Sequence, residues 1–310
     1  MDDRQVSMLL EQADRARVDH QWSRAIDLLR RALTLDPDHP RAHASLALAL
    51  LGAQRLHGAT IEAGMALAFD GNDSCCHYAA AAVKLAERKL GDAWEHCLVA
   101  LQADSTDVDA HVLGARIRRL QGQPATAREL LHRALELQPS HMDALTALAR
   151  VELDTGQLGE AARVADTALT TEPGNVDAHV VAGFIALRQN DVAAAETHGR
   201  FALTQDAVDR DALALWSAIK ARKSWSLGLW WRLNAFVSMR TEAGQLAMLV
   251  GSFVVISLLE IFAGAFDLER LEKLLAWSWL GFCAYTWVAP SIFRRMLEAD
   301  LKSVVLDREF

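Results

Sequence analysis

The chain has 310 residues, of which 52% are hydrophobic, with only 6 Pro and 17 Gly. Because Ala and Leu dominate the apolar residues and helix breakers are few, the composition predicts an almost entirely helical protein. It excludes a disordered chain, a collagen-like chain and a β-sandwich. The net charge of −8 gives no electrostatic footprint for DNA or RNA, so we expect no nucleic-acid partner. The four cysteines lack metal-site spacing and favour a reducing compartment.

Small residues recur every 34 positions through the first two thirds of the chain. Two columns, beginning at Ala25 and Ala32, are alanine in all six places, and a third, beginning at Ala13, is alanine or glycine throughout. Residues seven positions apart share one face of a helix, where a methyl side chain lets a neighbouring helix approach closely. Between the columns, Gly122 and Gly156 suit the left-handed conformation of a tight turn. Each repeat therefore predicts a helix, a turn and a second helix.

With this period and these small residues, the repeats resemble the tetratricopeptide repeat (TPR) family over residues 6–221. They begin at Val6, Pro40, Ser74, Val108, Met142 and Val176. Residues 1–221 would form one all-α domain of six repeats, with a capping helix at 210–221. The resemblance implies a right-handed superhelical solenoid whose concave groove binds a peptide or a partner helix.

Two long apolar stretches follow the repeats in residues 241–310. Residues 245–266 contain one ionisable side chain, Glu260, and residues 274–293 carry no charged side chain. At about 1.5 Å per residue, the first stretch reaches ~33 Å as a helix, enough to cross a bilayer. They predict a transmembrane hairpin, although a buried helical hairpin in a soluble fold is the alternative. Glu260 lies near one end of its span, where it could pair within the membrane or reach the headgroup water.

Lys and Arg flank the predicted hairpin on the side of both chain ends. Five cations precede the first span: Lys220, Arg222, Lys223, Arg232 and Arg240. The positive-inside rule then places both termini and the repeats in the cytoplasm. The N-terminal residues lack the features of a secretory signal. These features predict a location at the cytoplasmic membrane, and the tail resembles bacterial membrane-anchored TPR proteins with a two-span C-terminal module.

The basic, Trp-rich connector at residues 222–240 joins the repeats to the hairpin. Its composition suits a helix at the lipid headgroups, so membrane lipid is an expected partner of the connector as well as of the hairpin. Its polar residues do not gather on one helical face, however, and packing under the last repeat is the alternative.

The TPR resemblance also implies which side chains face the groove. They are Arg17, Leu48, Tyr78, Arg116, Arg119, Arg150, Phe184 and Arg188. The arginines among them could form a cationic strip that binds an acidic peptide or a C-terminal carboxylate, because a guanidinium can form two hydrogen bonds with one carboxylate. The alternative is that Asp109, Asp143 and Asp177 neutralise this strip. The Lys/Asn carboxylate clamp of chaperone-binding TPR proteins is not reproduced.

No motif indicates catalysis, and we expect neither an enzyme nor a bound cofactor. His43, His77, His111 and His179 occupy one column of the repeat. Equivalent positions in successive repeats should lie ~10 Å apart, too far for one metal ion, so these side chains are predicted to serve packing.

The sequence as a whole predicts a non-enzymatic adaptor or scaffold, held at the cytoplasmic face of a membrane and binding a protein or peptide in its groove. The alternative is an accessory subunit of a membrane enzyme or transporter that acts through its hairpin.

Overall fold

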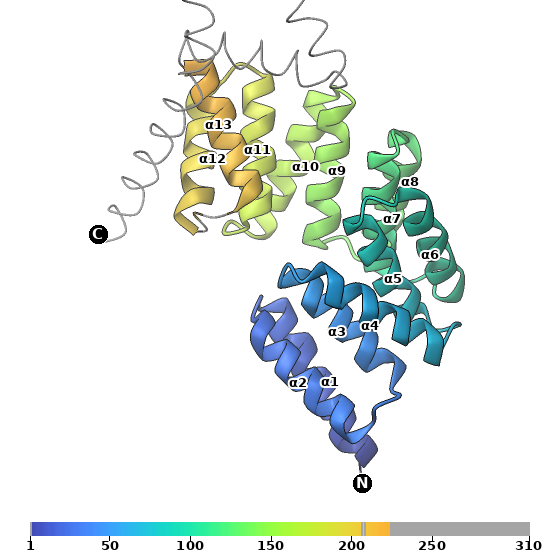
Figure 1. Ribbon diagram of the computed structural model, residues 1–310. Coiled ribbons are helices and arrows are strands. Elements are labelled where there is room, and N and C mark those ends of the chain that lie inside the picture. Colours follow the sequence, from blue (N-terminus) through green and yellow to red (C-terminus); the bar gives the residue numbers. More distant parts are fainter. Residues whose placement is uncertain (1, 206, 208, 224–310) are drawn as a thin grey trace, which may run out of the picture. The chain divides into compact units, whose positions relative to one another are not determined.

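The computed structural model describes residues 2–205, 207 and 209–223. These residues form thirteen α-helices, and none of them lies in a strand (Figure 1). No helix within this part of the chain has the length and hydropathy needed to cross a bilayer. The predicted hairpin and nearly all of the predicted connector lie outside the described residues. The chain divides into two compact units, Met1–Pro173 and Gly174–Phe310, which we describe separately.

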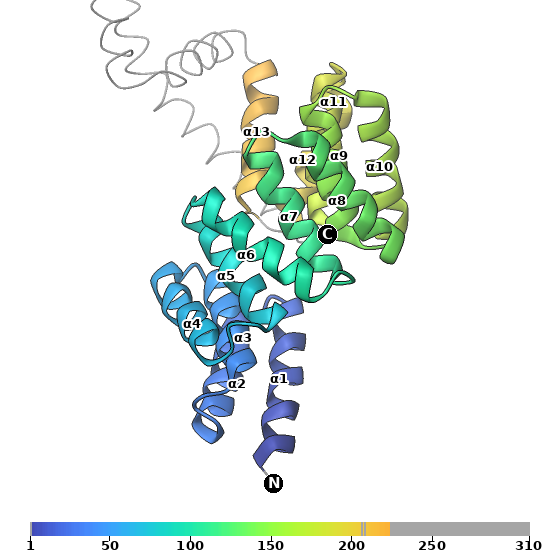
Figure 2. The same cartoon turned by 90° about the vertical axis from the view of Figure 1, so that its right-hand side faces the viewer.

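The first unit consists of five helix pairs (Figure 1 and Figure 2). Their bounds are α1 Asp2–Val18, α2 Trp22–Leu35, α3 Pro40–Gly52, α4 Leu56–Phe69, α5 Ser74–Ala86, α6 Leu90–Ala103, α7 Val108–Leu120, α8 Pro124–Leu137, α9 Met142–Asp154 and α10 Leu158–Thr171. The two helices of each pair pack together, and the first helices α1, α3, α5, α7 and α9 contact one another in this order. The second unit contains α11 Val176–Arg188, α12 Val192–Gln205 and α13 Arg210–Lys223, each in contact with the other two.

The first helices start where the 34-residue register places them. Helices α3, α5, α7, α9 and α11 begin at the five residues from which the sequence counts repeats two to six. The side chain that precedes each of them accepts a hydrogen bond from a backbone N–H in the first turn, which satisfies a group that the helix leaves unpaired. These caps are His39, Asp73, Asp107, His141 and Asn175.

The turn inside each repeat has a left-handed residue, as Gly122 and Gly156 predict. The same slot holds His20, Gln54, Arg88 and Asn190 in the other repeats, with φ between 56° and 65°. A side chain makes this conformation costly, so its recurrence without glycine needs compensation. The next residue donates a hydrogen bond back to the helix, as from Gln21 N to the carbonyl oxygen of Ala16 at 2.8 Å. Such bonds close the end of the first helix.

The three columns of small residues are buried throughout the repeats. All twelve alanines of the columns that begin at Ala25 and Ala32 have 0% exposure. In the third column, a Cβ added to Gly183 would lie only 2.4 Å from Cδ2 of Leu215, which shows how closely α13 approaches α11. The columns therefore mark the places where helices approach one another most closely, as the sequence predicts.

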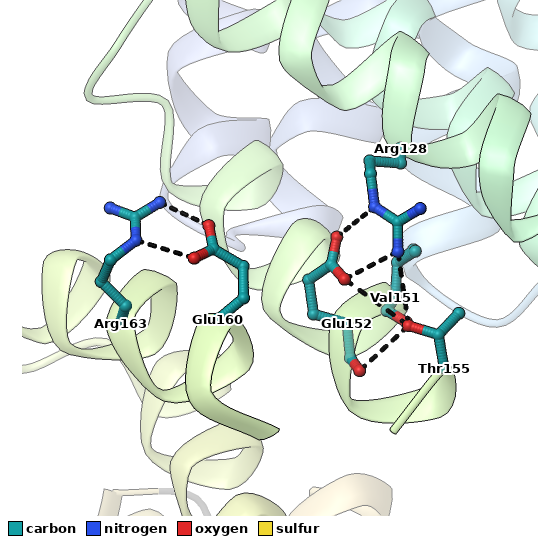
Figure 3. Close-up of polar contacts among 6 residues, drawn as sticks. All are labelled: Arg128, Val151, Glu152, Thr155, Glu160 and Arg163. Carbon is teal, nitrogen blue, oxygen red and sulfur yellow. Dashed lines mark hydrogen bonds and ion pairs between the residues drawn. The ribbon is translucent and has the colours of Figure 1, made fainter. Parts of the chain in front are cut away.

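One ion pair ties α8 to α9 inside the first unit. Arg128 donates from Nε to Glu152 Oε1 at 2.5 Å and from Nη2 to Glu152 Oε2 at 2.7 Å. Glu152 is only 2% exposed, and the hydroxyl of Thr155 lies beside the pair (Figure 3). The pair between Arg163 and Glu160 has the same two-bond geometry but lies within the exposed surface of α10 (Figure 3).

These two pairs allow a test of how burial of the carboxylate changes the contribution of an ion pair to stability. Arg128→Met should lower the free energy of unfolding by about 1–3 kcal/mol, because it leaves a buried carboxylate without its cation and Arg128 itself is partly exposed. Arg163→Met should cost less than about 1 kcal/mol, since its pair is solvated. Urea unfolding of the full chain, followed by circular dichroism, measures both. The double change Arg128→Met/Glu152→Leu should recover most of the loss. Equal costs for the two single changes would contradict this account.

Candidate partner-binding face on the first helices

Six of the predicted groove residues lie on the first helices of the first unit. They are Arg17 on α1, Leu48 on α3, Tyr78 on α5, Arg116 and Arg119 on α7, and Arg150 on α9. We call these six residues the partner face. Arg116 is exposed and the other five are half-buried. Phe184 and Arg188 lie on α11 in the second unit, the former half-buried and the latter exposed.

Tyr78 lies on α5, which contacts the first helices α3 and α7. Burial raises the pKa of its phenol to about 12, and the carboxylate of Asp109 acts in the same direction. The guanidinium groups of Arg17 and Arg116 oppose this rise, so both are near enough to influence the phenol. The structure thus brings together one half-buried aromatic ring and two of the predicted arginines, which come from α1 and α7.

Carboxylates on the first helix α9 neutralise part of the predicted cationic strip. Arg116 Nη2 donates to Asp143 Oδ2 at 3.0 Å, and Arg119 Nη1 donates to Asp154 Oδ2 at 2.7 Å. Both bonds run from α7 to α9. Arg116 therefore pairs with one of the three carboxylates named in the alternative, and Arg119 pairs with a carboxylate outside that set. Asp143 was among the carboxylates considered, whereas Asp154 was missed although it occupies a groove-facing position of its repeat.

A third polar contact between neighbouring first helices involves a helix cap. Asp109 Oδ1 lies 3.2 Å from Nε2 of His141, the residue that caps α9. Across the α3–α5 contact, Arg41 Nε donates to Asp73 Oδ2 at 2.9 Å, and Asp73 caps α5. Polar groups at the start of a first helix thus repeatedly bond to a side chain of the preceding first helix.

The partner face keeps hydrogen-bond donors for another molecule. Arg116 is 46% exposed at its side chain and gives one nitrogen to Asp143, whereas a guanidinium carries five N–H groups. Arg17 is 31% exposed at its side chain and pairs one nitrogen with Asp14 at 3.5 Å. Exposed ion pairs contribute only about 0–1 kcal/mol, so an incoming carboxylate or carbonyl can replace Asp143 at low cost.

The described cysteines do not have the properties of activated nucleophiles. Cys76 and Cys97 are buried, and burial raises the pKa of each thiol to about 12. A reactive cysteine has the opposite shift, toward the thiolate. Burial also raises the pKa of Cys75. No cluster of three or more metal-ligating side chains occurs in the described part of the chain.

Solved structures share this fold at low sequence identity. PilW, a widely conserved type IV pilus biogenesis factor, has a TM-score of 0.55 and 18% identity over 68% of this chain and 98% of its own. PilF of Pseudomonas aeruginosa has a TM-score of 0.52 and 17% identity over 69% and 98%. A chain of the APC/C hetero-tetramer Cut9–Hcn1 has a TM-score of 0.58 and 13% identity over 68% and 42%. These likenesses establish the fold alone.

A comparison with curated proteins found no match. The profile of the tetratricopeptide repeat matches residues 10–73, 113–175 and 146–212, which together exceed half of the chain. The matched segments contain the capped first helices α3, α9 and α11, five of the six residues in each buried alanine column and every left-handed turn except the one at Arg88. The chain therefore belongs to the tetratricopeptide repeat family.

Proposed function

We propose that this protein is a scaffold that binds a protein or peptide partner on its partner face, at the cytoplasmic side of a bacterial membrane. The observation that carries the proposal is the convergence of Arg17, Tyr78 and Arg116 on the first helices of a TPR array. TPR arrays serve mainly as interaction scaffolds. The chain that resembles ours in the Cut9–Hcn1 hetero-tetramer belongs to a protein assembly, which agrees with such a role.

The chemistry of the face favours a partner with a carboxylate next to an apolar or aromatic side chain. The half-buried ring of Tyr78 offers apolar area, and the arginines on both sides of it offer charge-assisted donors. The partner's carboxylate would replace Asp143 as the acceptor for Arg116. Because Asp143 and Asp154 already neutralise part of the face, a strongly acidic partner is not required.

The membrane location is supported by the sequence of residues 245–266 and 274–293. The basic end of α13 leads toward these segments: Arg222 Nη1 donates to Asn190 Oδ1 at 3.2 Å, and Lys223 pairs with Glu196. Two of the cations that precede the first span are thus attached to the sixth repeat. We propose that the remaining connector, with Arg232 and Arg240, lies near anionic lipid.

Membrane anchoring can be tested by fractionation. The full chain should stay in the membrane pellet through an alkaline carbonate wash, because two apolar spans hold it in the bilayer. A chain that ends at Lys223 should appear in the supernatant. Its circular dichroism spectrum should show that its repeats are as helical as in the full chain. If the full chain is released by the wash, the two-span proposal is wrong.

The partner face can be tested with a variant that reverses the charge of two of its arginines, and with a control variant that reverses two arginines outside the face. Arg116→Glu/Arg150→Glu should remove co-purifying proteins that the wild-type chain retains, because both donors on the face become acceptors. Arg133→Glu/Arg163→Glu changes two exposed arginines on the second helices α8 and α10 and should retain those proteins. Quantitative mass spectrometry after purification in mild detergent measures how much partner protein each variant retains. The difference between the two variants should shrink as the salt concentration rises, because salt screens the charged contacts with the partner.

The same experiment separates the adaptor from the accessory-subunit alternative. If both double variants keep the wild-type partners, recognition does not use the partner face. Replacing residues 241–310 by an unrelated membrane anchor should then abolish function, as the accessory subunit requires, whereas the adaptor keeps its partners with any anchor.

A further inference from the structure

Two histidine pairs have the same geometry in two separate repeats. His77 Nδ1 lies 3.1 Å from His96 Nδ1 in the third repeat, and His179 Nδ1 lies 2.9 Å from His198 Nδ1 in the sixth. Each pair joins the first helix of its repeat to the second. All four side chains are half-buried, so water reaches them. Two imidazolium rings cannot meet in this way, because both nitrogens would then carry a proton.

The first histidine of the pair in the third repeat is fixed by its other nitrogen. His77 Nε2 donates to the carbonyl oxygen of Gly71 at 2.9 Å, and the same column makes the same bond in His43 and His111, to Pro37 and Ser105. A neutral ring that donates from Nε2 carries its lone pair on Nδ1. This second bond to a carbonyl is the arrangement that orients a metal-ligating histidine.

The second-helix residue that lies opposite this histidine column varies between repeats. Its identity decides whether Nδ1 of the column histidine has a hydrogen-bond partner. In the second repeat it is Glu62, at 2.6 Å from His43 Nδ1. In the fourth it is Leu130, and His111 Nδ1 is buried without a hydrogen-bond partner in the described chain. A histidine therefore occurs opposite His77 and His179, whereas other repeats have a non-histidine residue there. The pairs are not required for folding a repeat of this family.

We propose that His77 with His96, and His179 with His198, form two binding sites for a divalent late transition metal such as Cu²⁺ or Zn²⁺. Imidazole is a preferred ligand of these ions, with metal–nitrogen distances of about 2.0–2.1 Å. Two such bonds at 90° to 110° put the nitrogens ~2.9–3.4 Å apart, which matches both pairs. Small ring rotations would direct the two lone pairs at one ion, and water molecules would complete its coordination.

The charges around the third-repeat pair suit a cation. Asp92 and Glu95 lie near His96 on α6, and the nearby Lys84 is paired with Glu87 at 3.4 Å. In the sixth repeat, Phe201 packs against His179 with ring centroids 3.9 Å apart, which shields one side of that pair. The sequence analysis considered the histidines of one first-helix column, whereas His96 and His198 lie on the second helices.

Isothermal titration of the untagged full chain in detergent with Cu²⁺ tests the proposal. The wild-type chain should bind two equivalents of Cu²⁺ more tightly than it binds any further Cu²⁺. His96→Leu and His198→Leu should each lose one equivalent, and the double variant should lose both. These changes copy Leu130 of the fourth repeat, so the fold should be kept, as circular dichroism checks. His57→Leu, an exposed histidine outside the pairs, should retain both equivalents.

Other outcomes overturn the proposal. If wild type binds no Cu²⁺ more tightly than the double variant does, the pairs are only hydrogen bonds between helices. If His57→Leu loses as much binding as His96→Leu, the ion binds surface histidines without preference. Should a leucine variant unfold, His96→Gln and His198→Gln keep a polar side chain of similar size that is a poor ligand, and the same comparison of equivalents decides.

Discussion

The close approach of neighbouring helices at the alanine columns is the constraint on which the rest of this structure depends. The alanines of these contacts are buried, and at Gly183 even a methyl group would collide with Leu215. Each alanine buries little apolar area, so no single contact dominates stability, and the array depends on the repetition of the same contact. Because the columns recur every 34 residues, they also fix where each turn and each helix start must lie.

The partner face follows from this packing. When first helices lie side by side in one register, an acidic residue near the start of one helix comes next to an arginine of the preceding helix, as for Asp143 and Arg116. Such exposed pairs are weak and exchangeable, which suits a surface that takes and releases a partner. The pair of the partly exposed Arg128 with the buried Glu152 has a different role, since it joins a second helix to the next first helix.

Periodicity predicted what depends on backbone register: the helix starts, the left-handed turns and the buried small columns. It could not predict which charged side chains meet, because that depends on rotamers and on partners in another repeat. Asp154 was overlooked for Arg119 for this reason, and so was His96 for His77. The residues beyond Lys223 lie outside the described structure, and the membrane hairpin stays a prediction from hydropathy and charge.

The central claim is that the alanine columns, rather than general hydrophobicity, hold the repeats together. The most direct measurement is the thermal midpoint of two variants on α8, Ala127→Phe and Ala125→Phe, followed by circular dichroism. Ala127 belongs to a buried column and is 0% exposed, whereas Ala125 is exposed on the same helix. Overpacking at Ala127 should cost at least about 1–3 kcal/mol and lower the midpoint by several degrees, while Ala125→Phe should leave it nearly unchanged. Equal midpoints for the two variants would contradict the account.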